Sequence, residues 1–259
     1  TATGGYALFA GGNNGNYSNV VDAYNRSLTR TKPAGLEKYG VHIAASVGQY
    51  AIIATNDLSN SFIDDVADSY VIYNNSLTKI SNNIGTTVKA RTGKGVANVG
   101  NYALFAGGVE GTLLNPSYCA DVDAYNTSLT RISVTAIDSG IDSVRCSASI
   151  GSSYVLFRVG IGTLPAFNIN AYDASLTKRS VTVPTKDSNE MAAASSENYA
   201  IFADRHFVVA YNDSLTCIMM TSLSDERVEG AAATVGNYVL FAGGLNSGKK
   251  DIVDVYTID

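Results

Sequence analysis

The sequence predicts an all-β protein made of a repeated four-stranded unit, and three observations lead to this expectation. The phrase YALFAGG stands at Tyr6–Gly12 and at Tyr102–Gly108, and YVLFAGG stands at Tyr238–Gly244. A second phrase, Ser-Leu-Thr preceded by Ala-Tyr-Asn or a close variant, follows most of these copies. Between the phrases, apolar residues alternate with polar ones and glycine and asparagine separate the runs, which is typical of strands and turns.

The last copy shows how one unit is arranged. The small residues of Gly230–Gly236 predict a first strand that ends in a tight turn, and the apolar run that follows predicts a second strand closed by Gly243-Gly244. After a loop at Leu245–Lys250, the alternating sequence DIVDVYTID predicts a third strand. In the earlier copies a short turn around Asn-x-Ser leads to a fourth strand, such as LTRISV at Leu129–Val134.

Six copies of the second strand begin at a tyrosine, and their spacing predicts a β-propeller. Successive tyrosines are 39 to 52 residues apart, close to the roughly 40–50 residues of a four-stranded propeller blade. A ring of such blades leaves no long unpaired sheet edge. We therefore expect one domain over residues 1–259, with blades at roughly 1–35, 36–85, 86–137, 138–183, 184–221 and 222–259. The six tyrosines are Tyr6, Tyr50, Tyr102, Tyr154, Tyr199 and Tyr238.

Both ends of this array are incomplete. The chain begins with a clipped first strand before Tyr6 and ends at Asp259 after a third strand. We expect six blades with an incomplete blade at the termini. The alternative is five blades, in which Gly230–Gly236 serves as the inner strand of the first blade. Because the chain starts at Thr1 rather than at a methionine, we also expect a processed form or a domain of a larger polypeptide.

The repeated unit resembles the kelch repeat. Both have a small-residue strand, a strand ending in Gly-Gly, a strand ending near Tyr and a fourth strand, and Arg91 and Arg227 stand where kelch units often carry arginine. Kelch units usually have a Trp on the fourth strand, whereas this chain has no Trp and carries Leu-Thr in that place. The resemblance is to the degenerate, Trp-less kelch-like arrays of bacterial and phage proteins. It implies a cell-surface, adhesion or tail-fibre role, outside the cell or on a virion.

The differences between copies gather on one face of the expected disc. Neighbouring strands run antiparallel, so the first-to-second and third-to-fourth turns share one face, and these turns are nearly constant. The second-to-third and fourth-to-first connections share the opposite face, and they differ in every copy. We call this second face the long-loop face. Loops tolerate change in general, but tolerance alone would vary both faces, so we expect the long-loop face to bind a partner.

The long-loop face should present aromatic side chains beside polar ones. Such a mixture suits contact with another protein or stacking against a sugar, so the expected partner is a protein or a glycan. The candidate binding residues are Asn13, Asn14, Tyr17, Tyr39, Asn60, Phe62, Arg91, Tyr118, Arg205, His206 and Lys250.

Composition and motifs disfavour other classes of function. A net charge of −5 without a basic stripe argues against a nucleic-acid partner, and no apolar run approaches the roughly 18 residues of a membrane-spanning helix. The only histidines, His42 and His206, cannot form a His-rich metal centre. Asp64, Asp65 and Asp68 lack the order of a calcium loop and are expected to be solvated. We therefore predict no catalytic residue, metal or cofactor.

The three cysteines and the Asn-x-Ser triplets also have simple interpretations. Cys119, Cys146 and Cys217 cannot all pair within one chain and contain no Cys-x-x-Cys spacing. We expect free thiols, with Cys146 a small core residue. Most Asn-x-Ser triplets fall in the repeated third-to-fourth turn, where Asn and Ser are interpreted as turn formers rather than glycan acceptors.

Three functions follow from the sequence as hypotheses. The first is a non-catalytic binding module that uses the long-loop face. The second is a structural scaffold or spacer within a larger assembly. The third is an enzyme that uses the central channel, which requires carboxylates or metal ligands to converge at the channel mouth.

Overall fold

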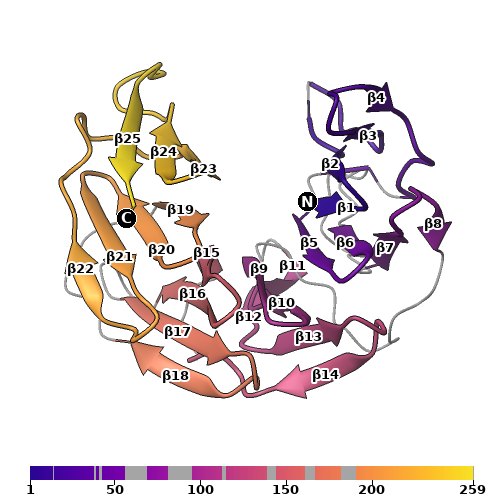
Figure 1. Cartoon of the computed structure of the whole chain (residues 1–259), viewed down its shortest axis with the longest axis horizontal. Coiled ribbons are helices and arrows are strands. Elements are labelled where there is room, and N and C mark those ends of the chain that lie inside the picture. Colours follow the sequence, from indigo (N-terminus) through magenta and orange to yellow (C-terminus); the bar gives the residue numbers. More distant parts are fainter. Residues whose placement is uncertain are drawn as a thin grey trace.

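The chain forms a six-blade β-propeller. The computed structural model describes residues 1–258 except 14, 38, 41–42, 56–68, 81–94, 113–114, 139–143, 161–166 and 182–190. The regular secondary structure of these residues consists of β-strands alone. Six small antiparallel sheets follow one another around an arc, with their first strands on the inside and their fourth strands on the outside (Figure 1). The predicted all-β class and the predicted six blades are confirmed.

Each blade contributes its strands in chain order from the inside to the outside. The first strands are β1 (Ala2–Thr3), β5 (Ile43–Val47), β9 (Gly95–Val99), β15 (Val144–Ile150), β19 (Met191–Ser195) and β23 (Ala231–Val235). The second strands are β2 (Tyr6–Ala10), β6 (Tyr50–Thr55), β10 (Tyr102–Ala106), β16 (Tyr154–Gly160), β20 (Ala200–Asp204) and β24 (Tyr238–Ala242).

The outer strands complete the sheets. The third strands are β3 (Val21–Tyr24), β7 (Ser69–Tyr73), β13 (Val122–Asn126), β17 (Phe167–Asp173), β21 (Phe207–Tyr211) and β25 (Val253–Thr257). The fourth strands are β4 (Arg30–Thr31), β8 (Lys79–Ile80), β14 (Arg131–Val134), β18 (Lys178–Val181) and β22 (Cys217–Met219). Within the described residues blade 6 has three strands, as the sequence predicts.

The five-blade alternative is wrong. In that arrangement the segment Gly230–Gly236 would pair with the first blade. Instead β23 pairs with β24, with Ala233 opposite Leu240, while β1 pairs with β2, with Ala2 opposite Ala7. The local turn at Gly236, which has φ +54, favours pairing with the adjacent strand because it closes the hairpin without a long loop.

Two further expectations need correction. The second-to-third connection of blade 3, expected to be a loop like the other connections of the long-loop face, contains the hairpin of β11 (Val109–Thr112) and β12 (Asn115–Tyr118). The fourth strand of blade 3, expected to begin at Leu129, begins at Arg131 because Leu129 belongs to the turn.

The repeated turn holds a leucine in a left-handed conformation. Leu129 has φ +61, and its counterparts Leu28, Leu77, Leu176 and Leu215 have φ between +56 and +62. In blade 3 the Asn126 side-chain oxygen accepts hydrogen bonds from the amides of Ser128 and Thr130, both at 2.9 Å. This bonding confirms that the asparagine of the Asn-x-Ser triplet is a turn former. The left-handed region costs a non-glycine residue roughly 1–2 kcal/mol, so the leucine must contribute something in return.

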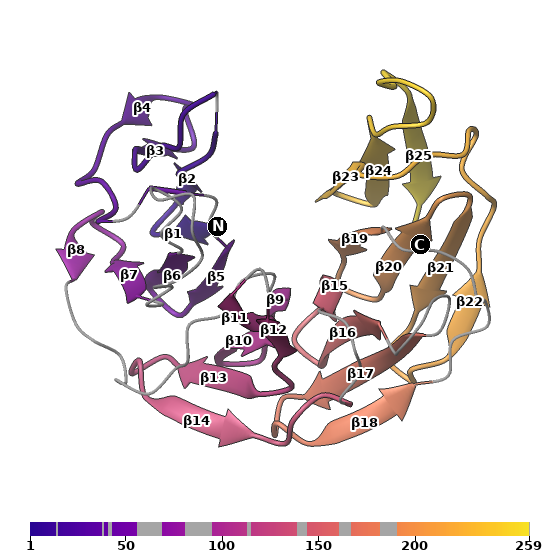
Figure 2. The same cartoon turned by 180° about the vertical axis from the view of Figure 1, so that it is seen from behind.

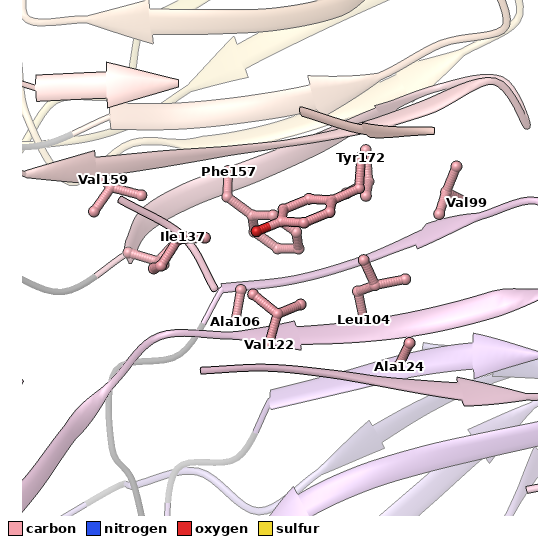
Figure 3. Close-up of a cluster of buried hydrophobic side chains, with 11 residues drawn as sticks. Val99, Leu104, Ala106, Val122, Ala124, Ile137, Phe157, Val159 and Tyr172 are labelled. Carbon is pink, nitrogen blue, oxygen red and sulfur yellow. The ribbon is translucent and has the colours of Figure 1, made fainter. Parts of the chain in front are cut away.

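Five interfaces between neighbouring blades contain the core. At the third of these, Leu104 and Ala106 of blade 3 pack against Val155 and Phe157 of blade 4, and all four are fully buried. Figure 3 shows this cluster, with Val122 and Ala124 beside Ala106 and Leu104, and Tyr172 beside Phe157. The alternation of a strand places successive side chains on opposite faces of a blade. Each blade therefore offers one apolar set to the preceding blade and the other set to the following one.

The turn leucine is part of these interfaces. Leu77, Leu129, Leu176 and Leu215 each pack against the core cluster between their own blade and the preceding blade. Leu28 has no preceding blade and is 79% exposed. The packing of four of the five leucines offsets the cost of their left-handed backbone.

Hydrogen bonds tie the inner strands together. The hydroxyl of Ser149 donates to the carbonyl of Asn98 at 2.6 Å, and the hydroxyl of Thr234 donates to the carbonyl of Ser195 at 2.7 Å. The side chain of Asn98 donates in the same way to the carbonyl of Ser46. Each bond joins equivalent positions of neighbouring blades. Polar side chains of the first strands are therefore hydrogen-bonded to the next blade.

The first and last blades each leave one apolar face exposed. The sheet β1–β4 and the sheet β23–β25 stand on the two sides of an opening in the arc (Figures 1 and 2). On blade 1, Phe9 is 64% exposed. On blade 6, Val253 and Val255 are 51% and 56% exposed. Their counterparts in blade 3 (Phe105, Val122 and Ala124) are at most 2% exposed, so the outer faces of the end blades lack the cover that the inner blades have.

Candidate interaction face

The strand topology places the variable connections on one face. All strand pairs within the blades are antiparallel and consecutive, so every second-to-third connection lies on the same side as every fourth-to-first connection. This side is the long-loop face. The tight first-to-second and third-to-fourth turns lie on the opposite side.

Apolar residues anchor the fourth-to-first connections to the blades. Leu36, Ile137 and Leu223 are 3%, 4% and 5% exposed. Their amides donate to the carbonyls of Asn19, Ala120 and His206, at 2.8, 3.0 and 2.8 Å. At all three interfaces a buried apolar side chain is combined with an amide that donates to a carbonyl just before the third strand. These connections therefore run along the start of the third strands and insert a side chain into the core. The sequence comparison missed these anchors because they lie in segments whose length and composition vary.

The loops of blade 1 bring three candidate residues together. The Gly12 amide donates to the Gly40 carbonyl at 2.8 Å, and the Gly40 amide donates to the Ser18 carbonyl at 3.2 Å. Tyr17 and Tyr39, which precede the bonded Ser18 and Gly40, are 38% and 46% exposed. Asn13 is also exposed, and its side-chain oxygen accepts the Gly15 amide at 2.8 Å. Two exposed phenol rings on paired segments are suited to contact a protein or sugar surface.

The hairpin β11–β12 carries the candidate residue of blade 3. Tyr118 is at the end of β12 and is 41% exposed. It pairs with Val109 across the hairpin. The next residue is tied down, because the Cys119 amide donates to the Gly108 carbonyl at 2.8 Å.

Blades 5 and 6 hold Arg205, His206 and Lys250 around one connecting loop. Arg205 forms an ion pair with Glu226 at 3.0 Å, and Lys250 forms one with Asp225 at 2.6 Å. The hydrogen bond from Lys250 lowers the pKa of Asp225 below its usual value of 3.8. Exposed pairs such as Arg205–Glu226 contribute only about 0–1 kcal/mol to stability. Arg205 therefore remains available to exchange its intramolecular partner for a ligand.

A buried arginine holds the same loop from below. The Arg227 guanidinium donates to the Asp254 carboxylate at 2.5 Å, to the Phe241 carbonyl at 3.1 Å and to the Asp225 carbonyl at 3.1 Å. Burial favours the neutral form of Asp254, but hydrogen bonds from Ser224 and Arg227 outweigh it and lower its pKa below 3.8. Arg227 is 4% exposed, so it positions the loop and does not itself contact a partner.

The candidate residues thus occupy three places on the long-loop face. The first is the loops of blade 1, with Asn13, Tyr17 and Tyr39, and the second is Tyr118 on blade 3. The third lies at blades 5 and 6 and consists of Arg205, His206 and Lys250. Phe207, which stacks edge-to-face on His206 at 5.9 Å and is 39% exposed, belongs to the last group and was missed. Phe207 is the first residue of a strand, and the sequence analysis considered residues of the loops. The candidates Asn14, Asn60, Phe62 and Arg91 lie outside the described residues, as do His42, Asp64, Asp65 and Asp68.

Several other titratable side chains take part in structural contacts. Lys178 pairs with Asp138 at 2.6 Å, and this contact, with hydrogen bonds from Asn170 and Asn168, lowers the pKa of Asp138 despite partial burial. All three cysteines are free thiols. Cys146 packs against the core between blades 4 and 5, and burial raises the pKa of its thiol to about 12. Among the described residues no group of three or more His, Cys, Asp and Glu side chains is placed to hold a metal ion.

Comparisons with known proteins add no assignment. No model of a known protein family matches the chain, and a search of curated protein sequences found no match. Within the described ranges, no helix is long and apolar enough to span a membrane.

Proposed function

We propose that this chain is a non-catalytic binding module that presents its long-loop face to a protein or a glycan. The supporting observation is the contrast between the two faces. On the tight-turn face, Asn25, Asn74, Asn126, Asp173 and Asn212 each accept the amides two and four residues further on. On the long-loop face, the second-to-third connection is a hairpin in blade 3 and a two-residue turn in blade 5.

The anchored loops favour binding as well. A loop that is already fixed loses less conformational freedom when it binds, so more of its contact energy appears as affinity. Leu36, Ile137 and Leu223 fix three connections in this way. Tyr17, Tyr39 and Tyr118 then supply exposed aromatic rings, the side chains most often enriched at interfaces.

We also propose that the repeat is a degenerate kelch-like unit without the fourth-strand tryptophan. The first strand of small residues, the Gly-Gly after the second strand and the Tyr of the third strand support this proposal. On this basis we propose a bacterial or phage protein with a cell-surface, adhesion or tail-fibre receptor-binding role.

The proposal is tested with the intact chain on a glycan array and in binding assays on bacterial surface extracts. A double variant, Tyr17→Ala with Tyr39→Ala, and the single variant Arg205→Ala should each weaken the binding that is found. The matched control is Arg26→Ala with Asp213→Ala, since both residues are exposed at the variable position of the tight turns. Equal loss in the control variant, or the absence of any binding, would contradict the proposal.

A structural scaffold is the second candidate, and the exposed faces of the end blades favour it. Phe9 on blade 1 and, separately, Val253 and Val255 on blade 6 are exposed apolar residues whose counterparts in blade 3 are buried against a neighbouring blade. Contiguous apolar surface on a protein commonly marks a contact with another subunit. Sedimentation of the intact chain over a range of concentrations tests this candidate, because association through the end faces should be weakened by Phe9→Glu.

A further inference from the structure

The second-to-third turn of blade 5 departs from the repeat. In blades 1, 3 and 6 the second strand is followed by Gly-Gly, and the second glycine (Gly12, Gly108 or Gly244) has φ +111. In blade 5 the same two places hold Asp204 and Arg205, and Arg205 has φ +24. A positive φ is disfavoured for a residue with a side chain, and strain of this kind clusters at functional sites. The turn therefore carries a strained arginine where the repeat supplies glycine.

A buried ion pair lies directly below this turn. Arg158 of β16 stands where the other five blades have alanine, and its guanidinium lies 3.8 Å from the carboxylate of Asp204 in the next blade. The two side chains are 1% and 3% exposed. Replacing a buried ion pair by apolar side chains is often neutral or stabilising, so packing between the blades does not by itself require the pair. Two departures from the repeat, in neighbouring blades, thus meet at the start of one turn.

The turn lies beside the connection between blades 5 and 6, because the Arg205 carbonyl accepts the Arg227 amide at 2.9 Å. Adjacent residues of this connection supply two carboxylates. Glu226 pairs with Arg205 at 3.0 Å, and Asp225 pairs with Lys250 at 2.6 Å. Two hydrogen-bond donors and two acceptors therefore lie together at the surface, and the two pairs carry no net charge.

The same turn exposes an aromatic ring. Phe207 is the first residue of β21 and is 39% exposed. Its ring meets that of His206 edge-to-face, with centroids 5.9 Å apart. An exposed apolar ring next to paired charges suits a ligand that has both an apolar face and hydroxyl groups.

We propose that the blade 5 turn and the connection beside it form a binding site for a neutral saccharide. This inference rests on the proposed function and narrows its ligand to a neutral glycan. A sugar ring packs its C–H face against Phe207, and hydroxyls of the same or the next unit donate to Glu226 and accept from Arg205, since a hydroxyl is both donor and acceptor. The charges on both residues strengthen these hydrogen bonds. A ligand of one sign would instead displace one member of each pair and leave the other without its partner.

The binding experiment titrates the intact, isotope-labelled chain with the neutral disaccharides maltose, cellobiose and lactose and follows the backbone amide signals by NMR. At least one of the three should shift the amides of residues 205–207 and 225–227 saturably, with a Kd of about 1 mM or tighter. Phe207→Ala should weaken this binding roughly tenfold or more, because the sugar loses its apolar contact. The matched control is Phe9→Ala, which removes an exposed phenylalanine of blade 1 and should leave binding unchanged.

A second pair of variants separates binding from folding. Arg205→Gly should abolish binding while the urea midpoint stays the same or rises, because glycine relieves the positive φ. Arg30→Gln removes an exposed ion pair with Asp22 on blade 1 and should leave binding unchanged. A lower urea midpoint for Arg205→Gly would show that the arginine serves the fold, and would refute the argument from strain.

Three results would overturn the proposal. The first is binding of digalacturonic acid but of none of the neutral disaccharides, with an affinity that falls as salt is added, because the ligand would then be an anion. The second is binding of a neutral disaccharide that Tyr17→Ala with Tyr39→Ala removes and Arg205→Gly does not, which would leave the proposed function in place and move the site to blade 1. The third is the absence of any saturable shift up to about 20 mM disaccharide; the proposed function is then judged by the glycan array and the surface extracts alone.

Discussion

Alanine substitution at Phe105 should destabilise the protein far more than alanine at Phe9, although both residues stand in identical YALFAGG phrases. Both rings also lie edge-to-face against a tyrosine of the third strand, with centroids 5.9 Å apart. They differ in cover, since Phe105 is fully buried and Phe9 is 64% exposed. A buried Phe→Ala change costs about 3–5 kcal/mol. Burying a whole phenylalanine side chain stabilises by roughly 1.5–3 kcal/mol, so the partial burial of Phe9 predicts a cost of about 1 kcal/mol or less.

The assay is urea unfolding followed by far-ultraviolet circular dichroism and by tyrosine fluorescence, since the chain has 16 tyrosines and no tryptophan. Phe157→Ala serves as a positive control because Phe157 is fully buried at the next interface. If Phe9→Ala costs as much as Phe105→Ala, the outer face of blade 1 is covered in solution and the exposure argument fails. If both cost less than about 1 kcal/mol, the interfaces between blades do not carry the stability assigned to them.

Four more outcomes can be measured by the same unfolding assay or by mass spectrometry. Leu28→Asn should stabilise the protein by roughly 0.5–1 kcal/mol, because asparagine tolerates the left-handed backbone and the exposed Leu28 side chain contributes little packing. Leu129→Asn should instead destabilise the protein. The reverse order of stabilities would contradict the argument about the turn. Asn126→Ala should cost about 1–2 kcal/mol by removing an acceptor of two amides, while Asn126→Asp should retain most stability, as the natural aspartate in blade 4 suggests. The pKa of Asp254 is lowered on folding, so the stability that its carboxylate contributes is present above the ordinary pKa of 3.8 and is lost as pH falls through the lower folded value. Asp254→Asn should therefore destabilise the protein more at pH 7 than near pH 2–3. An equal effect at the two pH values would contradict this prediction. Cys146, with a thiol pKa raised to about 12, should resist alkylation near pH 8 in the folded chain and react in denaturant. Rapid alkylation of the folded chain would contradict the raised pKa.

The repeated turn shows where sequence reasoning succeeded and where it failed. The Asn-x-Ser-Leu-Thr phrase predicted a turn between the third and fourth strands, and the hydrogen bonds to Asn126 confirm it. The phrase did not predict that Leu129 adopts a left-handed backbone, because leucine is unfavourable there. The reason is tertiary: the leucine packs on the preceding blade, and a contact between blades leaves no local signal.

The candidate face shows the same division. The antiparallel repeat predicted which connections share a face, and the exposure of Tyr17, Tyr39 and Tyr118 agrees with their placement there. The sequence did not predict that Arg205 and Lys250 pair with Glu226 and Asp225. Those contacts depend on how a connection between two blades lies against the loops of both, and a single copy of the repeat carries no record of it.

The sequence by itself determined the all-β class and the side on which the variable loops gather, and it favoured six blades over five. These properties follow from period-two alternation and from a spacing that recurs along the chain, both of which act within one unit. The tertiary structure alone decided which apolar faces are covered. Phe9 and Phe105 have the same neighbours in sequence but differ in exposure, because burial depends on whether another blade stands against the face.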